Sequence, residues 1–281
     1  MSISGKSNSI SVVVPNYNGG RFIAQAIQSV LNQSLLPDEI IVIDDGSTDD
    51  SLEILRQFGD SIRVIQIPNS GAAVARNLGI LESSGDLIAL LDSDDYWHED
   101  KLLIQLKLIN SKTFDLVYCS SQEFIMGSGL GIVHQAHFSG DCYQYFINFP
   151  TSAIIKYGCS STLFRRSILA KSGVFDISVN APSEDWDFFR KLSRYAHVGI
   201  TNEILTYYRI HDSNISRKSL LNYYLGNKIG IKKMILDDSD ISFWGRRTIW
   251  RKFYFGYLKS FLKERELFLA FHCAMMLAVN L

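Results

Sequence analysis

The feature that most constrains this chain is a run of five apolar residues, 87–91, that leads directly into Asp92-Ser93-Asp94-Asp95. A short apolar run that ends at a turn signal is typical of a strand covered on both faces, as in a parallel α/β sheet. Such sheets bind ligands at the carboxyl ends of their strands. In an extended chain, Asp92 and Asp94 would point to the same side and could share a divalent cation with a phosphate. The alternative is an acidic turn in which Asp95 caps the next helix.

The first 120 residues alternate short apolar runs with segments of helical periodicity, which predicts βαβ units and a mainly parallel sheet flanked by helices. One of the helices is expected at about 72–82, before Gly85. Residues 120–158 are rich in loop formers, and Gly127-Ser128-Gly129 in this segment indicates a flexible turn. The predicted strands are Ile10–Val14, Glu39–Ile43, Ile62–Ile67, Asp86–Leu91 and Leu116–Cys119.

Bulk properties exclude several classes of protein. The formal net charge of −1 provides no basic field for nucleic-acid binding. The four cysteines are far apart and lack zinc-ligand spacing, so we expect reduced, buried thiols in a cytoplasmic protein. Residues 1–9 lack the apolar stretch of a secretory signal, and no run is long enough to cross a bilayer.

Polar clusters follow the predicted strands, and each alone could be a turn, a cap or a solvated helix face. Together they would lie along one edge of one sheet. The clusters are Pro15-Asn16-Tyr17-Asn18, Asp44-Asp45-Gly46-Ser47-Thr48, Gly71 with Ala75-Arg76-Asn77, and Asp92-Ser93-Asp94-Asp95.

This ordered set resembles the family 2 glycosyltransferases, inverting enzymes with the GT-A fold that use nucleotide-diphosphate sugars. The resemblance covers about residues 10–212 and predicts a GT-A-like domain over 1–212, with a nucleotide half at about 10–120 and an acceptor half at about 121–212. Residues 213–281 would form a helical C-terminal region. The further matching motifs are Gly85-Asp86, Phe164-Arg165-Arg166, Gly173-Val174-Phe175-Asp176, Glu184-Asp185-Trp186-Asp187-Phe188 and Tyr208-Arg209-Ile210-His211.

The resemblance implies a nucleotide site. Asp45 would contact the base, most often uracil, although Asp44 could be the acid that turns inward. Arg76 would lie near the base or the phosphates, unless it is a surface arginine of its helix. The residues expected to bind the nucleotide are Pro15, Asn16, Tyr17, Asp44, Asp45, Arg76, Asp92 and Ser93.

The resemblance also implies a metal and a base. Asp94 and Asp92 would hold Mn²⁺ or Mg²⁺ at the diphosphate, with Asp94 as the more direct ligand, and His211 would either reach the metal or be structural. Inversion requires a base for the acceptor hydroxyl, for which the motif indicates Asp185, with Glu184 as the second candidate. Without catalysis, the same acids would suit a helix N-terminus. Arg209 and Arg217 are further candidates for binding phosphate.

The C-terminal region changes in composition. Aromatic and basic residues alternate at helical spacing, which is typical of a helix at a membrane surface with anionic lipid. The alternative is a helix that packs its aromatic stripe on the catalytic domain. The apolar set is Phe243, Trp244, Trp250, Phe253, Tyr254, Tyr257, Phe261 and Leu262, and the basic set is Arg246, Arg247, Arg251, Lys252, Lys259 and Lys263.

The resemblance therefore implies a cytoplasmic, metal-dependent, inverting glycosyltransferase that moves a sugar from a nucleotide diphosphate, with UDP expected, to a hydroxyl of a glycan or lipid-linked saccharide. A lipid-linked acceptor would make contact with the inner face of the cell membrane useful. One alternative is a nucleotidyltransferase that makes nucleotide sugars, but the loop 16–20 is followed by only one cation, Arg21. The other is a catalytically silent protein that retains the fold. No motif identifies the sugar, the acceptor, its linkage or the oligomeric state.

Overall fold

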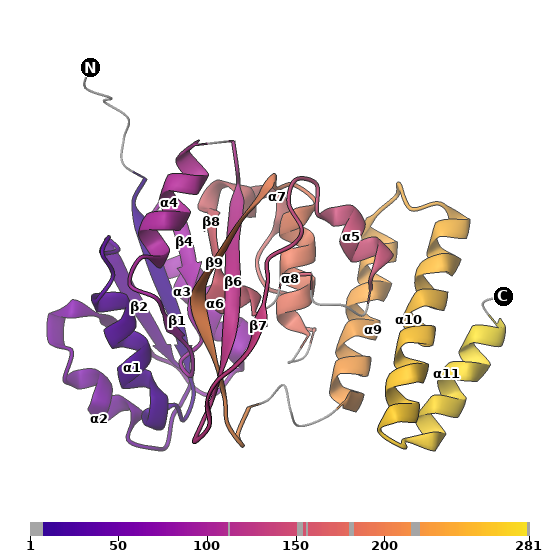
Figure 1. Cartoon of the computed structure of the whole chain (residues 1–281), viewed down its shortest axis with the longest axis horizontal. Coiled ribbons are helices and arrows are strands. Elements are labelled where there is room, and N and C mark those ends of the chain that lie inside the picture. The colour runs from indigo at the N-terminus through magenta and orange to yellow at the C-terminus, as the bar shows by residue number, and fades with distance from the viewer. Residues whose placement is uncertain are drawn as a thin grey trace.

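The structure is a computed structural model that describes residues 8–111, 113–150, 154–155, 157–179, 183–214 and 220–279. Its first half alternates strands and helices, and its last part is helical (Figure 1). The strands are β1 Ile10–Asn16, β2 Glu39–Asp44, β3 Arg63–Gln66, β4 Leu87–Leu90, β5 Tyr96–Trp97, β6 Leu116–Ile125, β7 Gly129–His134, β8 Thr162–Arg165 and β9 Val198–Ile210. The helices are α1 Gly20–Leu31, α2 Ser51–Arg56, α3 Ala72–Glu82, α4 Lys101–Ser111, α5 Tyr143–Asn148, α6 Gly158–Ser161, α7 Leu169–Ser172, α8 Glu184–Ser193, α9 Leu220–Asp237, α10 Phe243–Lys263 and α11 Leu267–Val279.

The described strands form one mixed sheet in the order β3-β2-β1-β4-β8-β6-β9-β5, with β7 paired to β6. The four strands β3, β2, β1 and β4 are parallel, β8 runs antiparallel to β4 and β6, and β9 is parallel to β6. The predicted α/β fold, with parallel strands in the first half of the chain, is thus confirmed. The parallel register places the ends of β1, β2 and β4 at the same edge of the sheet.

Both faces of the parallel strands are buried, which explains their unbroken apolar sequences. Side chains alternate between the faces. In β1, Val12 and Val14 pack with α1 and α4, whereas Val13 belongs to a second cluster that also contains side chains of α8, α9 and α10. The C-terminal helices therefore share a hydrophobic core with the sheet.

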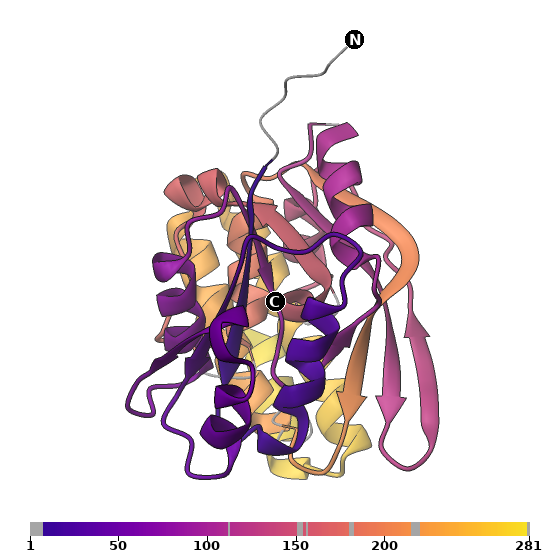
Figure 2. The same ribbon diagram turned by 90° about the vertical axis from the view of Figure 1, so that its left-hand side faces the viewer.

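The segment after residue 119 is more regular than predicted. β6 continues to Ile125 and forms a hairpin with β7, seen at the side of the molecule in Figure 2. Gly127 and Gly129 form the turn with φ of 81° and 86°, conformations that glycine adopts without strain. The predicted turn is correct, and the predicted strand Leu116–Cys119 is the buried first part of β6. The end of β6 and the whole of β7 were missed because most of their side chains are partly exposed and do not form an apolar run.

The C-terminal helices α9, α10 and α11 stack at the end of the molecule opposite α1 and α2 (Figure 1). The aromatic stripe of α10 divides between two environments. Phe253, Tyr254, Tyr257 and Phe261 are buried in the core, whereas Phe243, Trp244 and Leu262 are exposed. None of the described helices is long and apolar enough to span a bilayer.

Candidate active site

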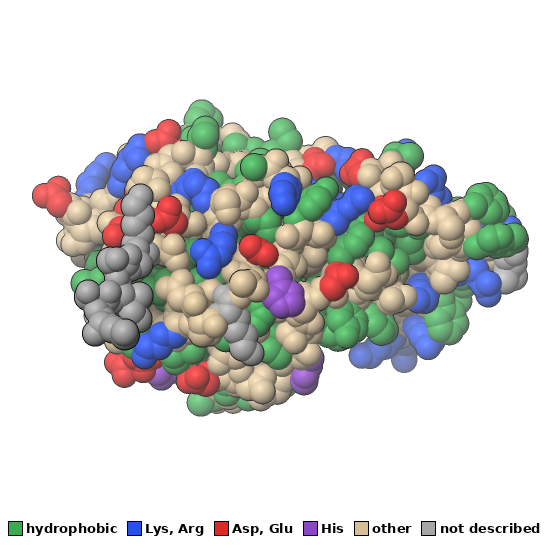
Figure 3. All heavy atoms as spheres, turned by 90° about the horizontal axis from the view of Figure 1, so that it is seen from above, with side chains coloured by type: hydrophobic (Ala, Val, Ile, Leu, Met, Phe, Trp, Pro, Cys, Tyr) green, Lys and Arg blue, Asp and Glu red, His purple; other side chains and the backbone are tan. Residues whose placement is uncertain are grey.

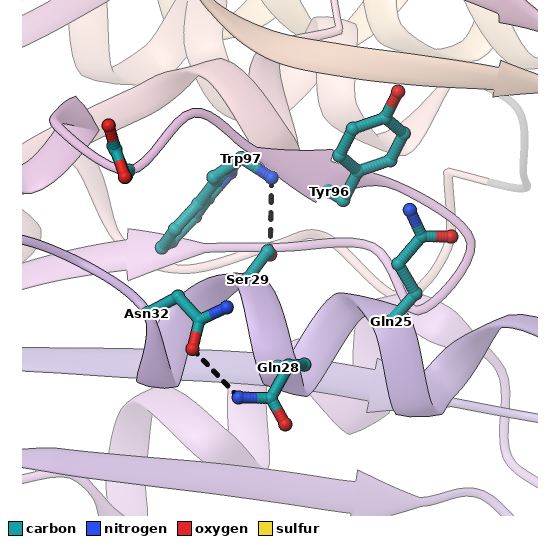
Figure 4. A pocket seen from close by; sticks show the side chains of 7 residues that line it. Gln25, Gln28, Ser29, Asn32, Tyr96 and Trp97 are labelled. Carbon is teal, nitrogen blue, oxygen red and sulfur yellow. Dashed lines mark hydrogen bonds between the residues drawn. The ribbon is translucent and has the colours of Figure 1, made fainter.

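A cavity of about 1130 Å³ opens where the parallel strands end. Its wall contains the ends of β1 and β4, the N-terminal part of α3, the first turn of α8 and residues that follow β9. A smaller cavity of about 240 Å³ lies between α1 and β5 (Figure 4). There the Gln28 amide donates a hydrogen bond to Asn32, and the backbone N–H of Trp97 donates one to Ser29 Oγ. The polar clusters singled out in the sequence line the larger cavity, so we consider it the candidate active site.

The two acids after β2 have different surroundings. Asp44 is 1% exposed and accepts hydrogen bonds from Asn16 Nδ2 (2.9 Å) and Ser47 Oγ (2.6 Å). Asp45 lines the cavity and accepts from the backbone N–H groups of Ser70 (2.6 Å) and Gly71 (2.8 Å). Asp44 thus braces the loop after β1, while Asp45 is the acid with access to a ligand.

The loop after β1 forms the adjoining wall. Pro15, Asn16 and Tyr17 all line the cavity, and Tyr17 is 52% exposed. A side chain on Gly19 would meet Asn16 Oδ1 at 2.2 Å, so glycine is required for the loop to approach this asparagine. Ser93, on the neighbouring loop, also faces this space.

Arg76 is buried at the centre of the cavity wall and is not a surface arginine. It donates to Asp92 Oδ1 (2.7 Å) and to Glu184 Oε1 (3.1 Å), which is 108 residues away in the chain. These two carboxylates hold the pKa of the guanidinium above its usual value despite burial. The arginine therefore links the turn after β4 to the first turn of α8.

The Asp92 to Asp95 segment is a turn, closed by a hydrogen bond from Asp95 N–H to the Asp92 carbonyl (3.0 Å). The expectation of an extended chain here is wrong. Asp92 faces Arg76, whereas Asp94 Oδ2 lies 3.0 Å from His211 Nε2 and 3.4 Å from Asn214 Nδ2. Asp95 does not cap α4, because it is fully buried and accepts from Ser160 Oγ (2.5 Å) and Arg209 N–H.

The described residues contain no group of three or more His, Cys, Asp or Glu side chains placed to hold a metal. Asp94 and His211 are nevertheless adjacent and line the cavity, and a carboxylate with an imidazole is a donor set that suits Mn²⁺. Remaining ligands would have to come from water or from a diphosphate, as is usual for Mg²⁺ sites.

The acids of α8 also differ. Glu184 is tied to Arg76, and Asp187 is buried in an ion pair with Arg190 (2.7 Å). Asp185 faces the cavity, and no cation among the described residues lies at salt-bridge distance from it. Its pKa is raised to about 7, first by burial and then by the charge of Glu184. Among these acids, Asp185 has the protonation behaviour suited to a general base near neutral pH.

Other residues fall outside the expected roles or were missed. Arg209 donates to the Asp94 carbonyl (2.8 Å) and Gln25 and is 3% exposed, so it supports the acidic turn rather than lining the cavity. Arg217 lies outside the described residues. The cavity residues of α9 and α10 were missed, because an aromatic stripe at helical spacing does not reveal which positions meet a cavity.

Comparison with known proteins agrees with this geometry. The family description Glycosyl transferase family 2 matches residues 11–173. An uncharacterized glycosyltransferase of Rickettsia typhi is 30% identical over 220 residues, which cover 75% of this chain and 67% of that protein. A glycosyltransferase of Rickettsia felis, also uncharacterized, is 37% identical over 166 residues, but the match spans only 28% of its length and 58% of this chain.

Solved structures show the same fold. S. aureus TarS 1-349 in complex with UDP-GlcNAc superimposes with a TM-score of 0.68 at 19% identity, covering 90% of this chain and 72% of that chain. The complex of TarS 1-349 with UDP gives a TM-score of 0.66 with the same coverage. Because the family description matches more than half of the residues, the chain belongs to glycosyl transferase family 2, and its fold is GT-A-like.

Proposed function

We propose that this enzyme transfers a sugar, with inversion, from a UDP-sugar to a hydroxyl of a saccharide or lipid-linked saccharide. The observation that carries the proposal is Asp185, a carboxylate with a raised pKa that has no salt-bridge partner in the described part of the chain. It lines the same cavity as Asn16 and Asp45, the residues expected to bind the nucleotide. TarS, which has the same fold, binds UDP and UDP-GlcNAc, and this supports a uridine donor.

In the proposed reaction, Asp185 accepts the proton of the acceptor hydroxyl as its oxygen attacks the anomeric carbon. The bond from that carbon to the diphosphate oxygen breaks with its electron pair, so UDP leaves and the configuration inverts. Asp45 and Asn16 orient the nucleoside, and Arg76 holds Glu184 and Asp92 in place beside the reacting groups. Positioning and charge placement thus supply the catalysis.

The charge of the cavity supports a requirement for a cation. Its described lining contains six carboxylates, Asp45, Asp92, Asp94, Glu123, Glu184 and Asp185, but one guanidinium, Arg76. A diphosphate would be repelled by such a surface unless positive charge accompanied it. We propose that Asp94 and His211 hold Mn²⁺ or Mg²⁺, with Asp92 nearby. When bound, the cation would offset the charge that develops on the leaving diphosphate.

The two alternative functions have less support. A nucleotidyltransferase needs cations for a triphosphate, but Arg21 packs against Phe22, with its guanidinium 5.2 Å from the ring centre, and is not part of the cavity lining. A catalytically silent binding protein would need neither a cavity acid with a raised pKa, such as Asp185, nor a buried arginine, Arg76, that holds a neighbouring acid. That Asp185 and the expected donor-side residues line one cavity supports sugar transfer over both alternatives.

A lipid surface is the proposed setting. Phe268, Phe271 and Met275 are exposed on α11, and Trp244 and Phe255 are exposed on α10 beside Arg247 and Lys259. Figure 3 shows apolar and basic side chains gathered at this end of the molecule. Exposed aromatics beside cations suit the interface of an anionic membrane, which would give access to a lipid-linked acceptor. A cytoplasmic location stays a prediction.

The proposal is tested by thermal unfolding of the full chain with a panel of nucleotide sugars, with and without Mn²⁺. A ligand that binds only the folded state raises its stability by mass action, by about 2.7 kcal/mol at one hundred times its Kd. We expect UDP-sugars to raise the midpoint only when Mn²⁺ is present. No shift with any UDP-sugar and Mn²⁺ would overturn the proposal.

A further inference from the structure

The cavity continues beyond Asp185 into a region that the C-terminal helices build. This acceptor-side region, as we name it, is lined by Phe146 of α5, Trp186 of α8, Tyr223 and Asn227 of α9, and Tyr257 and Ser260 of α10. Four of these residues follow residue 212, where the recognised sequence motifs end. The helical region is thus part of the active-site wall as well as of the core.

Two polar atoms in this region lack partners. Trp186 Nε1 and Asn227 Oδ1 are both buried and make no hydrogen bond within the described residues, although their residues are 7% and 6% exposed and line the cavity. Leaving such a group unpaired in the interior costs free energy, because its hydrogen bond to water is lost without replacement. A ligand that pairs both atoms would remove this cost, so the two side chains point to a binding site.

The side chains are held in position by their neighbours. Asn227 Nδ2 donates to Tyr257 Oη (2.9 Å), which leaves Oδ1 as the unused acceptor. The Trp186 ring packs on Gly230 of α9, where a Cβ would lie 3.0 Å from Cζ3, and edge-to-face on Phe146 with ring centres 5.9 Å apart. The indole is therefore confined to one position by residues of two other helices.

The chemistry of the two atoms selects the ligand. An indole N–H can only donate and an amide oxygen can only accept, whereas a hydroxyl does both. An alkyl chain would suit the aromatic side chains but would leave both atoms unpaired, at full cost. A sugar ring has an apolar face for the aromatic rings and hydroxyls for the two polar atoms.

We propose that the acceptor-side region is a subsite for a saccharide ring of the acceptor, with Trp186 and Asn227 as residues that determine specificity. Trp186 follows the candidate base Asp185 directly on α8, so a ring bound here lies next to the group that would take its proton. The inference rests on the proposed function for its role in transfer, but the binding of a saccharide can be measured without any donor.

The test uses the full chain and a panel of methyl glycosides, with binding followed by saturation-transfer NMR and UDP affinity measured in parallel by calorimetry with Mn²⁺. At least one glycoside should bind with a Kd on the order of 1 mM, a weak affinity of about −4 kcal/mol. Trp186→Phe and Asn227→Leu should each weaken that binding about tenfold, the effect of one lost hydrogen bond.

Two controls separate recognition from folding. Trp250→Phe makes the same change in a half-buried tryptophan of α10 that packs on Phe253 and Tyr254 and should not alter glycoside binding. Tyr257→Phe breaks the bond to Asn227 but leaves the amide oxygen, so it should weaken binding less than Asn227→Leu. UDP affinity reports that the donor half of each variant is folded.

The outcomes are distinguishable. If no glycoside binds the parent chain, or if Trp186→Phe and Asn227→Leu bind as the parent does, the subsite is wrong, whatever UDP does. If dodecylphosphocholine below its micelle concentration displaces the bound glycoside and binds the two variants as tightly as the parent, the region accepts an apolar chain and the saccharide assignment is overturned. Failure of UDP-sugars to bind would instead overturn the proposed function.

Discussion

The two halves of the cavity are stabilised in different ways. At the ends of β1 and β2, in the proposed nucleotide half, the partners are nearer in sequence: Asp44 accepts from Asn16, 28 residues away, and Asp45 accepts from the backbone of Ser70, 25 residues away. In the acceptor half, Glu184 is held by Arg76 across 108 residues and His211 by Asp94 across 117. Strand-and-turn geometry preforms the first half, whereas buried charges assemble the second. Substitutions should therefore affect the halves separately.

The largest separation is expected for Asp185→Asn. The change keeps size and polarity but removes the basic site, so transfer should fall by about 10²–10⁴. UDP affinity should stay within about twofold, since the nucleotide wall is not altered. Transfer is measured as incorporation of labelled sugar and affinity by calorimetry. Parental transfer by the variant would show that Asp185 is not the base, and loss of transfer in Glu184→Gln instead would move the role to Glu184.

Asp94→Asn should affect donor binding rather than the acceptor proton. If Asp94 and His211 hold the cation, the variant should lose the Mn²⁺ dependence of UDP binding and with it turnover. Asp95→Asn is the matched control in the same turn. Burial holds the pKa of the Asp95 carboxyl well above its usual range, so an amide of the same shape is tolerated there. Unchanged Mn²⁺-dependent UDP binding in Asp94→Asn contradicts the metal assignment.

Arg76→Met tests the link between the halves. It leaves Glu184 buried and Asp92 partly buried without their cation, and removal of one partner of a buried pair costs about 3–5 kcal/mol. Urea unfolding measures the loss, and Arg76→Met with Glu184→Gln should recover part of it. The control, Arg63→Met, breaks an exposed pair with Glu82 and should cost about 0–1 kcal/mol. Equal losses in the two arginine variants would show that the link is dispensable.

The two halves of the cavity also differ in how much of their structure can be predicted from the sequence. Apolar runs and the polar residues that follow them are local, so the parallel strands and the candidate residues Asn16, Asp45 and Asp94 are predictable from the chain alone. The partners of these residues are not. That Arg76 joins Glu184, or that Asn227 faces the cavity, depends on how distant helices pack, and no spacing in the sequence encodes it. The end of β6 and the strand β7 were missed for a different reason, because their partly exposed side chains form no apolar run.

The C-terminal helices have one surface that packs in the core and another that carries exposed apolar side chains. Truncation before α10 would remove Tyr257 and Phe261 from the core, so substitution of exposed residues is the cleaner test. Phe268→Ser with Phe271→Ser should weaken binding to anionic vesicles at least about tenfold, from the lost burial of two aromatics. Binding of the parent should also fall with salt. Leu81→Ser, at a 77% exposed position on α3, is the control. Binding is measured by flotation of the protein with the vesicles. Equal flotation of the parent, the double variant and the control would contradict membrane contact.

The smallest expected effect concerns how the two acids at the start of α8 influence each other. Asp185 must be ionised to accept a proton, and burial with the nearby charge of Glu184 raises its pKa to about 7, so transfer should decline as the pH falls below that value. Glu184→Gln removes one cause of the increase while Arg76 still favours the ionised form, so the acidic limb should move to lower pH. The measurement is the pH profile of kcat/KM for the parent and for Glu184→Gln. Glu99→Gln is the control, because Glu99 does not line the candidate active site and its loss should leave the profile unchanged. If the acidic limb stays fixed in Glu184→Gln, or moves to higher pH, the pKa of Asp185 does not set it. The kinetics would then give no support to an acceptor half whose charges act on one another.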